Sequence, residues 1–437
     1  MDSEALARQV IAKLREVGHQ AFLVGGCVRD LLLGVKPKDF DIATDARPDR
    51  IMDLFPRSGR VGAHFGVVLV RDVFDQVEVA TFRSDHDYMD GRHPEHVHFE
   101  TDPREDVLRR DFTINGLMMD PDSGAVLDFV DGRADLARGL VRAIGDPYAR
   151  FREDHLRLLR GVRFAARFGF EIEAATFDAI RRDHALILTV AMERVREELV
   201  RILTEGGARR GFELLDSSGM LLDLLPEVAA MKGVAQPPEY HPEGDVWRHT
   251  LLLLEHLHNP TPTLALGALL HDVGKPPTFR VAGRIRFDGH VEEGVRLARA
   301  ILTRLRFSRE AIEQVEALID NHMRFKDVSR MKESTLKRFL RLPEFSEHLE
   351  LHRLDATGSN QRLDNYHLAR KKFEEYTAEH LRPEPLLTGA VLIGMGYEPG
   401  PQFSLMLRSL EDAQLEGRIH TQEEAMDLVR ELFPREN

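Results

Sequence analysis

The sequence predicts an α+β protein, in which a first part with a small mixed sheet and flanking helices precedes a long all-helical part. Short apolar runs, such as Phe22–Val24 and Val77–Val79, are bounded by glycine and polar residues near the N-terminus, as strands are. From Tyr148 onward these strand patterns largely disappear, and apolar residues recur at helical spacing. A proline- and glycine-rich stretch at 231–244 indicates a domain boundary.

The composition limits the functional classes. The chain has 437 residues, a net charge of −13, 30% charged residues and one cysteine. This length predicts two to four domains. No apolar run approaches the ~18 residues of a membrane span, and the first residues lack a signal-peptide layout, so we expect no membrane association. The single cysteine, Cys27, fits a reducing cytoplasm and is expected to be a packed residue. The acidity argues against indiscriminate nucleic-acid binding but permits a local basic groove, and arginines concentrate between 142 and 167.

The first chemical motif lies between Phe22 and Thr44. A predicted strand ends in the Gly25-Gly26 turn, and a helical segment follows it and stops at Gly34. Paired glycines let a phosphate approach the backbone closely. Arg29, in the helical segment, would add a planar positive fork for that phosphate.

A second strand, expected at about 39–43, carries two carboxylates. Side chains two apart on a strand point the same way, so Asp39 and Asp41 are expected side by side. Two such carboxylates repel each other unless a cation lies between them, and carboxylate oxygen suits Mg²⁺. Glu78, in the predicted strand 76–81, could be a third acid or an ordinary edge-strand residue.

The remaining head segments follow in order. Residues 3–17 are expected to form an amphipathic helix, and a further helix is expected after Pro48. The polar stretch 84–95 is expected to be a mobile loop. Arg110 and Asp111 then begin a new segment, where Arg110 taken alone would be a surface ion-pair residue.

One amphipathic helix is expected over residues 151–168. Charged residues recur every three positions along one side of it, namely Asp154, Arg157, Arg160 and Arg163. Such a row is commonly a salt-bridged solvent face. A carboxylate and a guanidinium held three residues apart could also hydrogen-bond the edge of a nucleobase.

A second set of chemical residues follows the boundary at 231–244. It contains an adjacent His-Asp pair at the end of an apolar helix, with one histidine upstream and further candidates downstream: His249, His271, Asp272, His290, His322 and Asp355. Imidazole and carboxylate together suit a divalent transition metal. A single histidine on an apolar helix is more often a core residue, but this grouping predicts a metal site.

Four motifs resemble those of one known family. GGCVRDLLLG with DFDIAT, RRDFTINGLMMD and EDHLR resemble the motifs of class II tRNA nucleotidyltransferases and bacterial poly(A) polymerases, in the polymerase-beta superfamily. H…HD…D, with Lys275 in HDVGK, resembles the HD phosphohydrolases. The resemblance implies a polymerase-beta-like nucleotidyltransferase head at 1–145 and an all-α neck at 146–230 that selects the nucleobase and binds RNA. An HD domain at 240–360 and a helical tail at 361–437 would follow.

The resemblance also implies residue roles. Asp39 and Asp41 would be catalytic and bind Mg²⁺. Nucleotide would be bound by Gly25, Gly26, Arg29, Arg110, Asp111, Asp154, Arg157, Arg160 and Arg163. The HD-type residues would bind Mn, Ni, Co or Fe, with His290 and His322 matching members that hold two metals.

The implied activity is template-independent transfer of CMP and AMP from CTP and ATP to the 3′ end of tRNA, with release of pyrophosphate. HD-domain phosphohydrolase activity is expected beside it. Poly(A) polymerase activity and CC-only or A-only addition remain alternatives. So does a phosphohydrolase whose head only binds RNA. No obligatory protein partner is evident.

Overall fold

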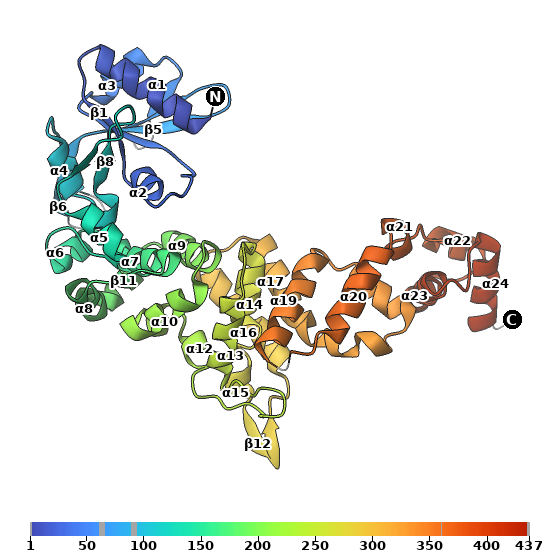
Figure 1. Cartoon of the computed structure of the whole chain (residues 1–437). Coiled ribbons are helices and arrows are strands. Elements are labelled where there is room, and N and C mark those ends of the chain that lie inside the picture. Colours follow the sequence, from blue (N-terminus) through green and yellow to red (C-terminus); the bar gives the residue numbers. More distant parts are fainter. Residues whose placement is uncertain (1, 61–65, 89–93, 360, 435–437) are drawn as a thin grey trace. The chain divides into compact units, whose positions relative to one another are not determined.

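The structure, a computed structural model, describes residues 2–60, 66–88, 94–359 and 361–434. The chain divides into two compact units, Met1–Ala229 and Ala230–Asn437 (Figure 1). The finer division into four domains stays a prediction. Among the described residues, no helix is both long enough and apolar enough to cross a membrane.

A seven-stranded sheet forms the centre of the first unit. Its strands, from edge to edge, are β3 (Ser58–Arg60), β4 (Val67–Arg71), β5 (Gln76–Thr81), β2 (Asp41–Thr44), β1 (Ala21–Val24), β8 (Leu117–Met119) and β9 (Val126–Asp128). Only β2 and β5 pair in parallel, and the other neighbours are antiparallel. The predicted mixed, mostly antiparallel sheet is therefore confirmed.

Helices cover this sheet through an apolar core. α1 (Ser3–Glu16) buries Leu6, Val10, Ile11 and Leu14, which recur at helical spacing as the sequence predicts. They share one cluster with Ile51 of α3 (Pro48–Leu54) and Val28 of α2 (Gly26–Leu32). Cys27 is buried in the same cluster, where burial raises the pKa of its thiol to about 11, as expected of a packed residue.

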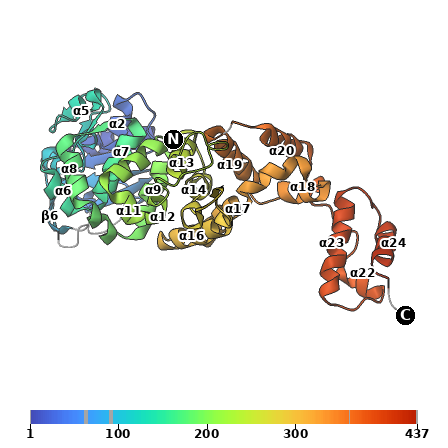
Figure 2. The ribbon, with the colours of Figure 1, turned by 90° about the horizontal axis from the view of Figure 1, so that it is seen from below.

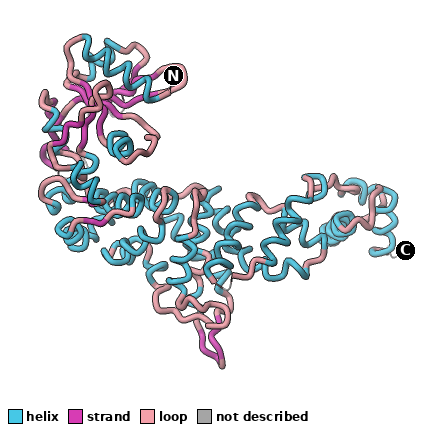
Figure 3. The backbone as a smooth tube through the Cα atoms, viewed as in Figure 1, coloured by secondary structure: helices cyan, strands magenta, loops and turns pink. Residues whose placement is uncertain are grey.

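Two local expectations in the head were wrong. The second strand begins at Asp41, so Asp39 lies in the bend before it and is exposed. The stretch predicted to be a mobile loop forms β6 (Arg83–Tyr88) and β7 (Pro94–Phe99), which pair in an antiparallel ladder, as the tube in Figure 3 shows. The sequence of this stretch is mostly polar, so no alternation of apolar and polar residues announces these strands. Residues 89–93 of that predicted loop lie outside the described residues.

The rest of the first unit is mostly helical. α4 (Pro103–Leu108) and the 3-10 turn η1 (Thr113–Asn115) lie between β7 and β8. After β9 come α5 (Gly132–Arg138), β10 (Leu140–Val141), α6 (Pro147–Glu153), α7 (Leu156–Phe168), β11 (Glu171–Ile172), α8 (Ala174–Asp183), η2 (His184–Thr189), α9 (Met192–Thr204), α10 (Ala208–Ser218), α11 (Met220–Leu224) and α12 (Pro226–Ala229). α7 packs on both α9 and α10. Gly207 lets the start of α10 approach α7 closely, because a Cβ at this position would lie 2.1 Å from the Ala166 carbonyl oxygen of α7.

The single helix expected over 151–168 is interrupted. Asp154 is extended, with φ −140° and ψ 106°, between α6 and α7. Its carboxylate accepts a hydrogen bond from the Leu156 backbone amide at 3.1 Å, at the start of α7. Aspartate competes with the helical backbone in this way and favours helix starts. The even charge spacing therefore concealed a helix boundary.

The second unit is helical apart from one hairpin. Its elements are α13 (Val246–Glu255), α14 (Pro262–Leu270), α15 (Lys275–Thr278), β12 (Arg280–Ala282), β13 (Arg284–Arg286), α16 (His290–Arg304), α17 (Arg309–Asn321), η3 (His322–Arg330), α18 (Glu333–Leu340), α19 (Phe345–Gly358), α20 (Asp364–Glu375), α21 (Ala378–Leu381), α22 (Gly389–Gly394), α23 (Pro401–Leu415) and α24 (Gln422–Leu432). Figure 1 shows the β12–β13 hairpin projecting from the helices of this unit. α22, α23 and α24 gather at the C-terminal end in Figure 2 around a core of their own.

Candidate functional site

A glycine turn and an arginine meet at the end of β1. Gly25 has φ +76°, a region that favours glycine, and a Cβ there would lie 3.1 Å from Nη1 of Arg110. The Arg110 guanidinium is held in place by the buried carboxylate of Asp106, which accepts from its Nη2 at 2.9 Å. Gly26 begins α2 directly after the turn. The structure therefore brings the predicted phosphate-binding glycines and Arg110 together.

Three carboxylates lie near this turn. Asp41 begins β2 and pairs in register with Glu78 of β5, and Asp39 lies two residues before it. Burial raises the pKa of Asp41 to about 6, assisted by the negative charges of Glu78 and Asp39 and opposed by Arg110. Carboxylates that repel one another in this way form a donor set that fits a hard divalent cation such as Mg²⁺.

Arg29 does not present the accessible fork that the sequence predicted. Its side chain is only 4% exposed. Nε and Nη2 donate to Oδ1 of Asp30 at 2.8 and 2.6 Å, and Nη1 donates to Oδ1 of Asn115 at 2.6 Å. The guanidinium also lies over the Phe164 and Phe168 rings of α7, 5.3 and 4.6 Å from their centroids. These contacts tie α2 to α7, so this geometry favours a positioning role over direct phosphate contact.

Asp111 lies at the centre of a buried polar network. It accepts from the Phe112 amide at 2.8 Å, from Nδ2 of Asn115 at 3.0 Å and from Nη2 of Arg160 at 2.6 Å. Burial alone would raise the pKa of Asp111, but the Arg160 guanidinium and the Asn115 amide hold it well below its usual range. Asp111 is thus a fixed anion that joins the second head motif to α7.

The charged row on α7 splits into exposed and buried members. Arg163 is buried with Glu198 of α9 at 2.5 Å. Arg157 is also buried, and its Nη2 donates to the Arg109 carbonyl oxygen at 2.8 Å. Asp154 and Arg160 stay partly exposed, and Nη2 of Arg194 lies 3.1 Å from Oδ2 of Asp154. The Arg157 backbone amide donates to the Asp154 carbonyl oxygen at 3.0 Å in the first turn of α7, and the predicted joint reading of a base by the two side chains stays a prediction.

The second unit brings all six predicted metal-ligating residues together. His249 comes from α13, the His271–Asp272 pair follows α14, His290 begins α16, His322 begins η3 and Asp355 lies in α19. Among these six residues, two groups of three each have ligand atoms within 4.8 Å of one another. The first is His249, His271 and Asp355, and the second is Asp272, His290 and His322.

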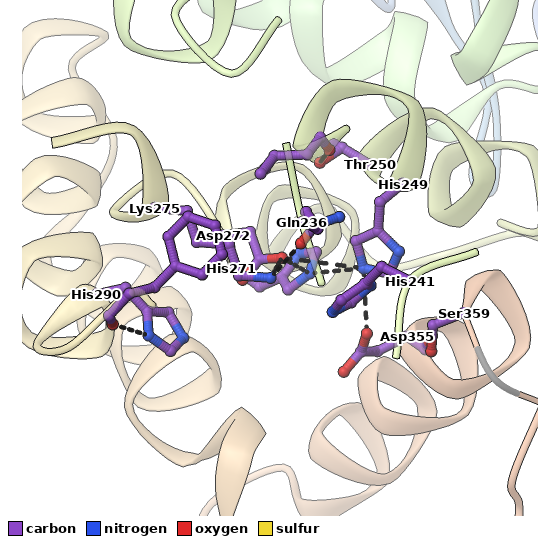
Figure 4. A network of polar contacts seen from close by, with 12 residues as sticks. Gln236, His241, His249, Thr250, His271, Asp272, Lys275, His290, Asp355 and Ser359 are labelled. Carbon is purple, nitrogen blue, oxygen red and sulfur yellow. Dashed lines mark hydrogen bonds and ion pairs between the residues drawn. The ribbon is translucent and has the colours of Figure 1, made fainter. Parts of the chain in front are cut away.

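Asp272, a member of the second group, also lies close to His271 of the first. Its Oδ2 is 3.2 Å from Nε2 of His271, while its Oδ1 is 4.0 Å from Nε2 of His322. Asp355 Oδ1 is 3.1 Å from Nε2 of His249. A carboxylate that lies beside both histidine groups fits a site for two neighbouring divalent ions. Figure 4 shows most of these side chains converging from separate helices.

Each of four histidines turns Nε2 toward this centre because Nδ1 is engaged elsewhere. Nδ1 of His271, His290 and His322 lies 3.0, 2.9 and 2.6 Å from the backbone oxygens of residues 268, 287 and 319. Nδ1 of His249 is 2.8 Å from Oε1 of Glu243. Such contacts fix the tautomer and orientation of metal-binding histidines. Nε2 of His290 is buried and lacks a hydrogen-bond partner among the described residues, so the donor set fits a bound metal.

Sequence reasoning missed three residues of this site, all in the stretch predicted to be a boundary. Gln236 is buried and accepts from Nζ of Lys275 at 2.6 Å, and that ammonium is also 2.6 Å from Oδ2 of Asp272. Oε1 of Glu243 lies 2.8 Å from Nδ1 of His241 as well as from His249. Proline and glycine content masked them, and the polar His-Pro-Glu run just before His249 was the available signal.

Gly274 allows the two halves of this site to approach. A Cβ at this position would lie 2.1 Å from the His290 carbonyl oxygen and 2.5 Å from the Gly294 amide nitrogen. The HDVGK stretch can therefore pack directly against the first turn of α16, where His290 lies. Four of the predicted ligands, Asp272, His290, His322 and Asp355, border a cavity of about 830 Å³ that also has Lys275, Lys326, Arg284, Arg286 and Arg362 on its walls.

Three known domain families match parts of this chain. Residues 21–142 match the "Poly A polymerase head domain", 169–232 match the "Probable RNA and SrmB- binding site of polymerase A", and 245–391 match the "HD domain". Residues 21–142 include the glycine turn, the carboxylates, Arg110 and Asp111. Residues 245–391 contain all six predicted metal-ligating residues.

Two curated relatives and one solved structure extend the comparison. The CC-adding tRNA nucleotidyltransferase of Thermus thermophilus is 36% identical over 93% of this chain and 92% of its own. The CCA-adding enzyme of Ligilactobacillus salivarius is 42% identical, but over 48% of this chain and 52% of its own length. The Bacillus stearothermophilus CCA-adding enzyme in complex with CTP has a TM-score of 0.76 and 25% identity, covering 99% of both chains.

The Thermotoga maritima CCA-adding enzyme complexed with tRNA shares the fold, with a TM-score of 0.61 and 20% identity over 99% of this chain. The polymerase-beta-like head and the helical remainder are thus confirmed. The chain therefore belongs to the family of tRNA nucleotidyltransferases and bacterial poly(A) polymerases, with a fused HD domain.

Proposed function

We propose that this protein adds nucleotides to the 3′ end of tRNA without a nucleic-acid template, using CTP and ATP. The observation that carries the proposal is the grouping of Asp39, Asp41 and Glu78 beside the Gly25 turn and Arg110. Carboxylates are needed to hold a cation, and a glycine turn with an arginine is needed to bind a triphosphate. Relatives named as CC-adding and CCA-adding enzymes support tRNA as the acceptor.

The reaction joins the tRNA 3′ oxygen to the α-phosphorus of the nucleotide. The P–O bond to pyrophosphate breaks, pyrophosphate leaves, and the hydroxyl proton passes to a base or to solvent. Asp39 and Asp41 would hold Mg²⁺, which lowers the charge repulsion at the α-phosphate when bound. Arg110, fixed by Asp106, would bind the triphosphate, and Gly25 and Gly26 leave room for it.

The nucleobase would be selected at the start of α7. Asp154 and Arg157 would hydrogen-bond the base edge, and Arg160, held by Asp111, would support the base or the sugar. Arg163 and Arg29 would act from behind this surface, because both are buried in ion pairs. Their substitution should therefore lower the stability of the head and neck without changing the choice between CTP and ATP.

Complete CCA addition is our first candidate, and CC-only addition is the second. A specific observation favours the second: the relative that this chain matches over 93% of its length is a CC-adding enzyme. Relatives named CCA-adding match at higher identity but over about half the chain, as the Ligilactobacillus salivarius and Bacillus pumilus enzymes do. Both candidates use the same head chemistry.

Single-nucleotide gel analysis of a tRNA that ends at its discriminator base separates the candidates. Two additions with CTP alone, and a third only when ATP is added, would establish CCA addition. Termination at CC with both nucleotides would establish the second candidate. A long ladder with ATP alone would identify a poly(A) polymerase, and no extension at all would refute the transferase proposal.

We propose that the HD site hydrolyses phosphomonoesters or phosphodiesters. His249, His271, Asp272, His290, His322 and Asp355 would hold two ions of Mn, Ni, Co or Fe, which supply Lewis-acid activation of water when bound. Water oxygen would join phosphorus, the ester P–O bond would break, and the leaving oxygen would take a proton. Lys275, 2.6 Å from Asp272, orients that carboxylate. We expect the protein to work in the cytoplasm, in keeping with its tRNA substrate and single cysteine.

A further inference from the structure

The β12–β13 hairpin carries three arginines on one face. Its register pairs Arg280 with Arg286 and Ala282 with Arg284, while Val281 pairs with Ile285. Directly opposed residues of an antiparallel pair share a face, and alternate residues on one strand do so too. Arg280, Arg284 and Arg286 therefore project together, and all three are exposed.

This arginine face has no internal counter-charge. Within the part of the chain that the structure describes, no carboxylate forms an ion pair with Arg280, Arg284 or Arg286. Like charges placed directly opposite each other destabilise a strand pair, and a two-stranded ribbon is only marginally stable by itself. Placing Arg280 against Arg286 therefore disfavours the free hairpin, and a bound anion would remove that repulsion.

The face is continuous with the HD cavity. Arg284, Arg286 and Phe287 line the same cavity as Asp272 and His322. Lys326 and Arg362 line it as well, and among the lining residues other than the predicted metal ligands the lysines and arginines outnumber the acids Glu239 and Asp288. A single phosphate at the metal-binding residues would leave the hairpin arginines without a partner, whereas a strand with several phosphates would reach both.

An aromatic pair lies at the base of the hairpin. The rings of Phe279 and Phe287 lie 5.9 Å apart, and Nζ of Lys275 is 5.4 Å from the Phe287 centroid. Phe279 is 39% exposed. Exposed aromatic rings next to a basic groove are the usual means of binding single-stranded nucleic acid, since bases stack on rings while arginines bind phosphates.

We propose that the β12–β13 hairpin binds the phosphate backbone of a single-stranded RNA end and so makes the HD site act on polynucleotides in preference to free nucleotides. The inference rests on the proposed phosphohydrolase function of that site. The arginine face determines KM for RNA, while the metal-binding residues determine the chemical step. Phe287 stacks a base next to the scissile phosphoester.

The first test compares two substrates with the full-length, metal-loaded protein. One is an RNA oligonucleotide that ends in a 2′,3′-cyclic phosphate, and the other is the matching cyclic mononucleotide. For the double variant Arg284→Gln/Arg286→Gln we expect KM for the oligonucleotide to rise roughly tenfold or more, because charge-assisted contacts exceed neutral ones. The kcat for RNA and both constants for the mononucleotide should stay within twofold.

Salt dependence gives an independent measure. Each phosphate contact to single-stranded nucleic acid contributes a slope of about 0.7 in the logarithm of affinity against the logarithm of salt concentration. The slope for the oligonucleotide should therefore fall by about 1.4 in the double variant. Arg296→Gln/Arg309→Gln is the matched control, since these exposed arginines pair with Glu293 and Glu313 outside the cavity lining. Equal losses for both substrates, or none for RNA, would overturn the proposal.

A cross-linking experiment separates this proposal from the hydrolase proposal. An oligonucleotide with 4-thiouridine at its 3′ end is irradiated with the full-length protein, and cross-linked peptides are mapped. Cross-links within residues 279–290 that vanish in Arg284→Gln/Arg286→Gln would support the hairpin even if no phosphoester were hydrolysed. Cross-links confined to residues 1–229 would refute it, whether or not the HD site is active.

Discussion

Replacing Arg29 with methionine tests whether this residue positions the neck or binds phosphate. Methionine keeps apolar contact with Phe164 and Phe168 but removes every hydrogen bond that the guanidinium donates. Asp30 is buried, and within the described ranges its carboxylate would then keep Arg167 as its one remaining charged partner, with Nη2 of Arg167 3.6 Å from its Oδ2. The substitution therefore leaves a buried carboxylate with one distant partner.

The expected loss of stability follows from those contacts. Removing one partner of a buried ion pair costs about 3–5 kcal/mol, and the remaining Arg167 places this case at the lower end, about 3 kcal/mol. The unpaired Oδ1 of Asn115 adds about 1 kcal/mol. We therefore expect the free energy of unfolding of the first unit to fall by about 3–4 kcal/mol. KM for CTP should change less than threefold under conditions where the protein stays folded.

Amide hydrogen exchange as a function of urea measures this loss in peptides from α2 and α7, apart from the second unit. Arg152→Met is the control, because Arg152 is exposed and its contact with Asp183 is 3.7 Å long, so the change should stay below about 1 kcal/mol. A stability change below 1 kcal/mol for Arg29→Met, together with a tenfold higher KM for CTP, would refute the positioning role and restore the phosphate fork.

The remaining predictions concern the carboxylates, Gly274 and the metals. Asp41→Asn should abolish nucleotide transfer and spare phosphoester hydrolysis, and Asp272→Asn should do the reverse; loss of both activities in either variant would contradict two separate sites. Because the folded-state pKa of Asp111 is depressed, its stabilisation is present above its unfolded pKa of about 4 and is lost below it. In denaturation experiments, Asp111→Asn should therefore be less stable than the wild type by about 2–3 kcal/mol at pH 7, and this difference should shrink toward pH 3. A stability difference that does not change with pH would contradict this account. Gly274→Ala should displace His290 and weaken binding of the second metal at least tenfold by calorimetry, whereas the exposed Gly283→Ala should not. Chelation should lower the melting temperature of the second unit, and Mn²⁺ should restore it while Mg²⁺ alone sustains transfer; an unchanged melting temperature would argue against a bound metal.

The glycine turn, the Asp41 region and the His271–Asp272 pair were accessible from the sequence because each lies within a short stretch. The other four HD residues lie on separate helices and were identified only as widely spaced residues that resemble the HD pattern. Gly25 and Gly26 follow an apolar run directly, and His271 and Asp272 are adjacent. Residues that must meet across a short turn or at a helix end leave a readable pattern. Their catalytic and metal-binding roles stay predictions, although the structure brings the side chains together.

The burial of Arg29 was not accessible, because the residues that enclose it are distant in the sequence. Phe164 and Phe168 lie on α7, and Asn115 lies in η1. An arginine in a short helix beside a glycine turn looks identical whether solvent or two phenyl rings face it. The break at Asp154 was hidden differently: a helix-starting aspartate happened to continue the three-residue charge spacing.

The second unit shows how composition can mislead. Proline and glycine at 231–244 predicted a domain boundary, and the compact units do divide beside it, yet Gln236 and Glu243 from this stretch also contact Lys275 and His249. Irregular backbone can place polar side chains as firmly as a helix when their partners are buried. Lys275 and His249 are both buried, so the Gln236–Lys275 hydrogen bond and the Glu243–His249 contact form away from competing water.

The stretch at 231–244 also limits where recombination could join this gene to another. The HD family similarity begins at residue 245, but the groups that orient Lys275 and His249 lie before it. A recombination event at residue 245 would transfer all six predicted metal ligands but leave out the residues that contact Lys275 and His249. A junction upstream of Gln236, close to Ala229 where the compact units divide, would keep these contacts together.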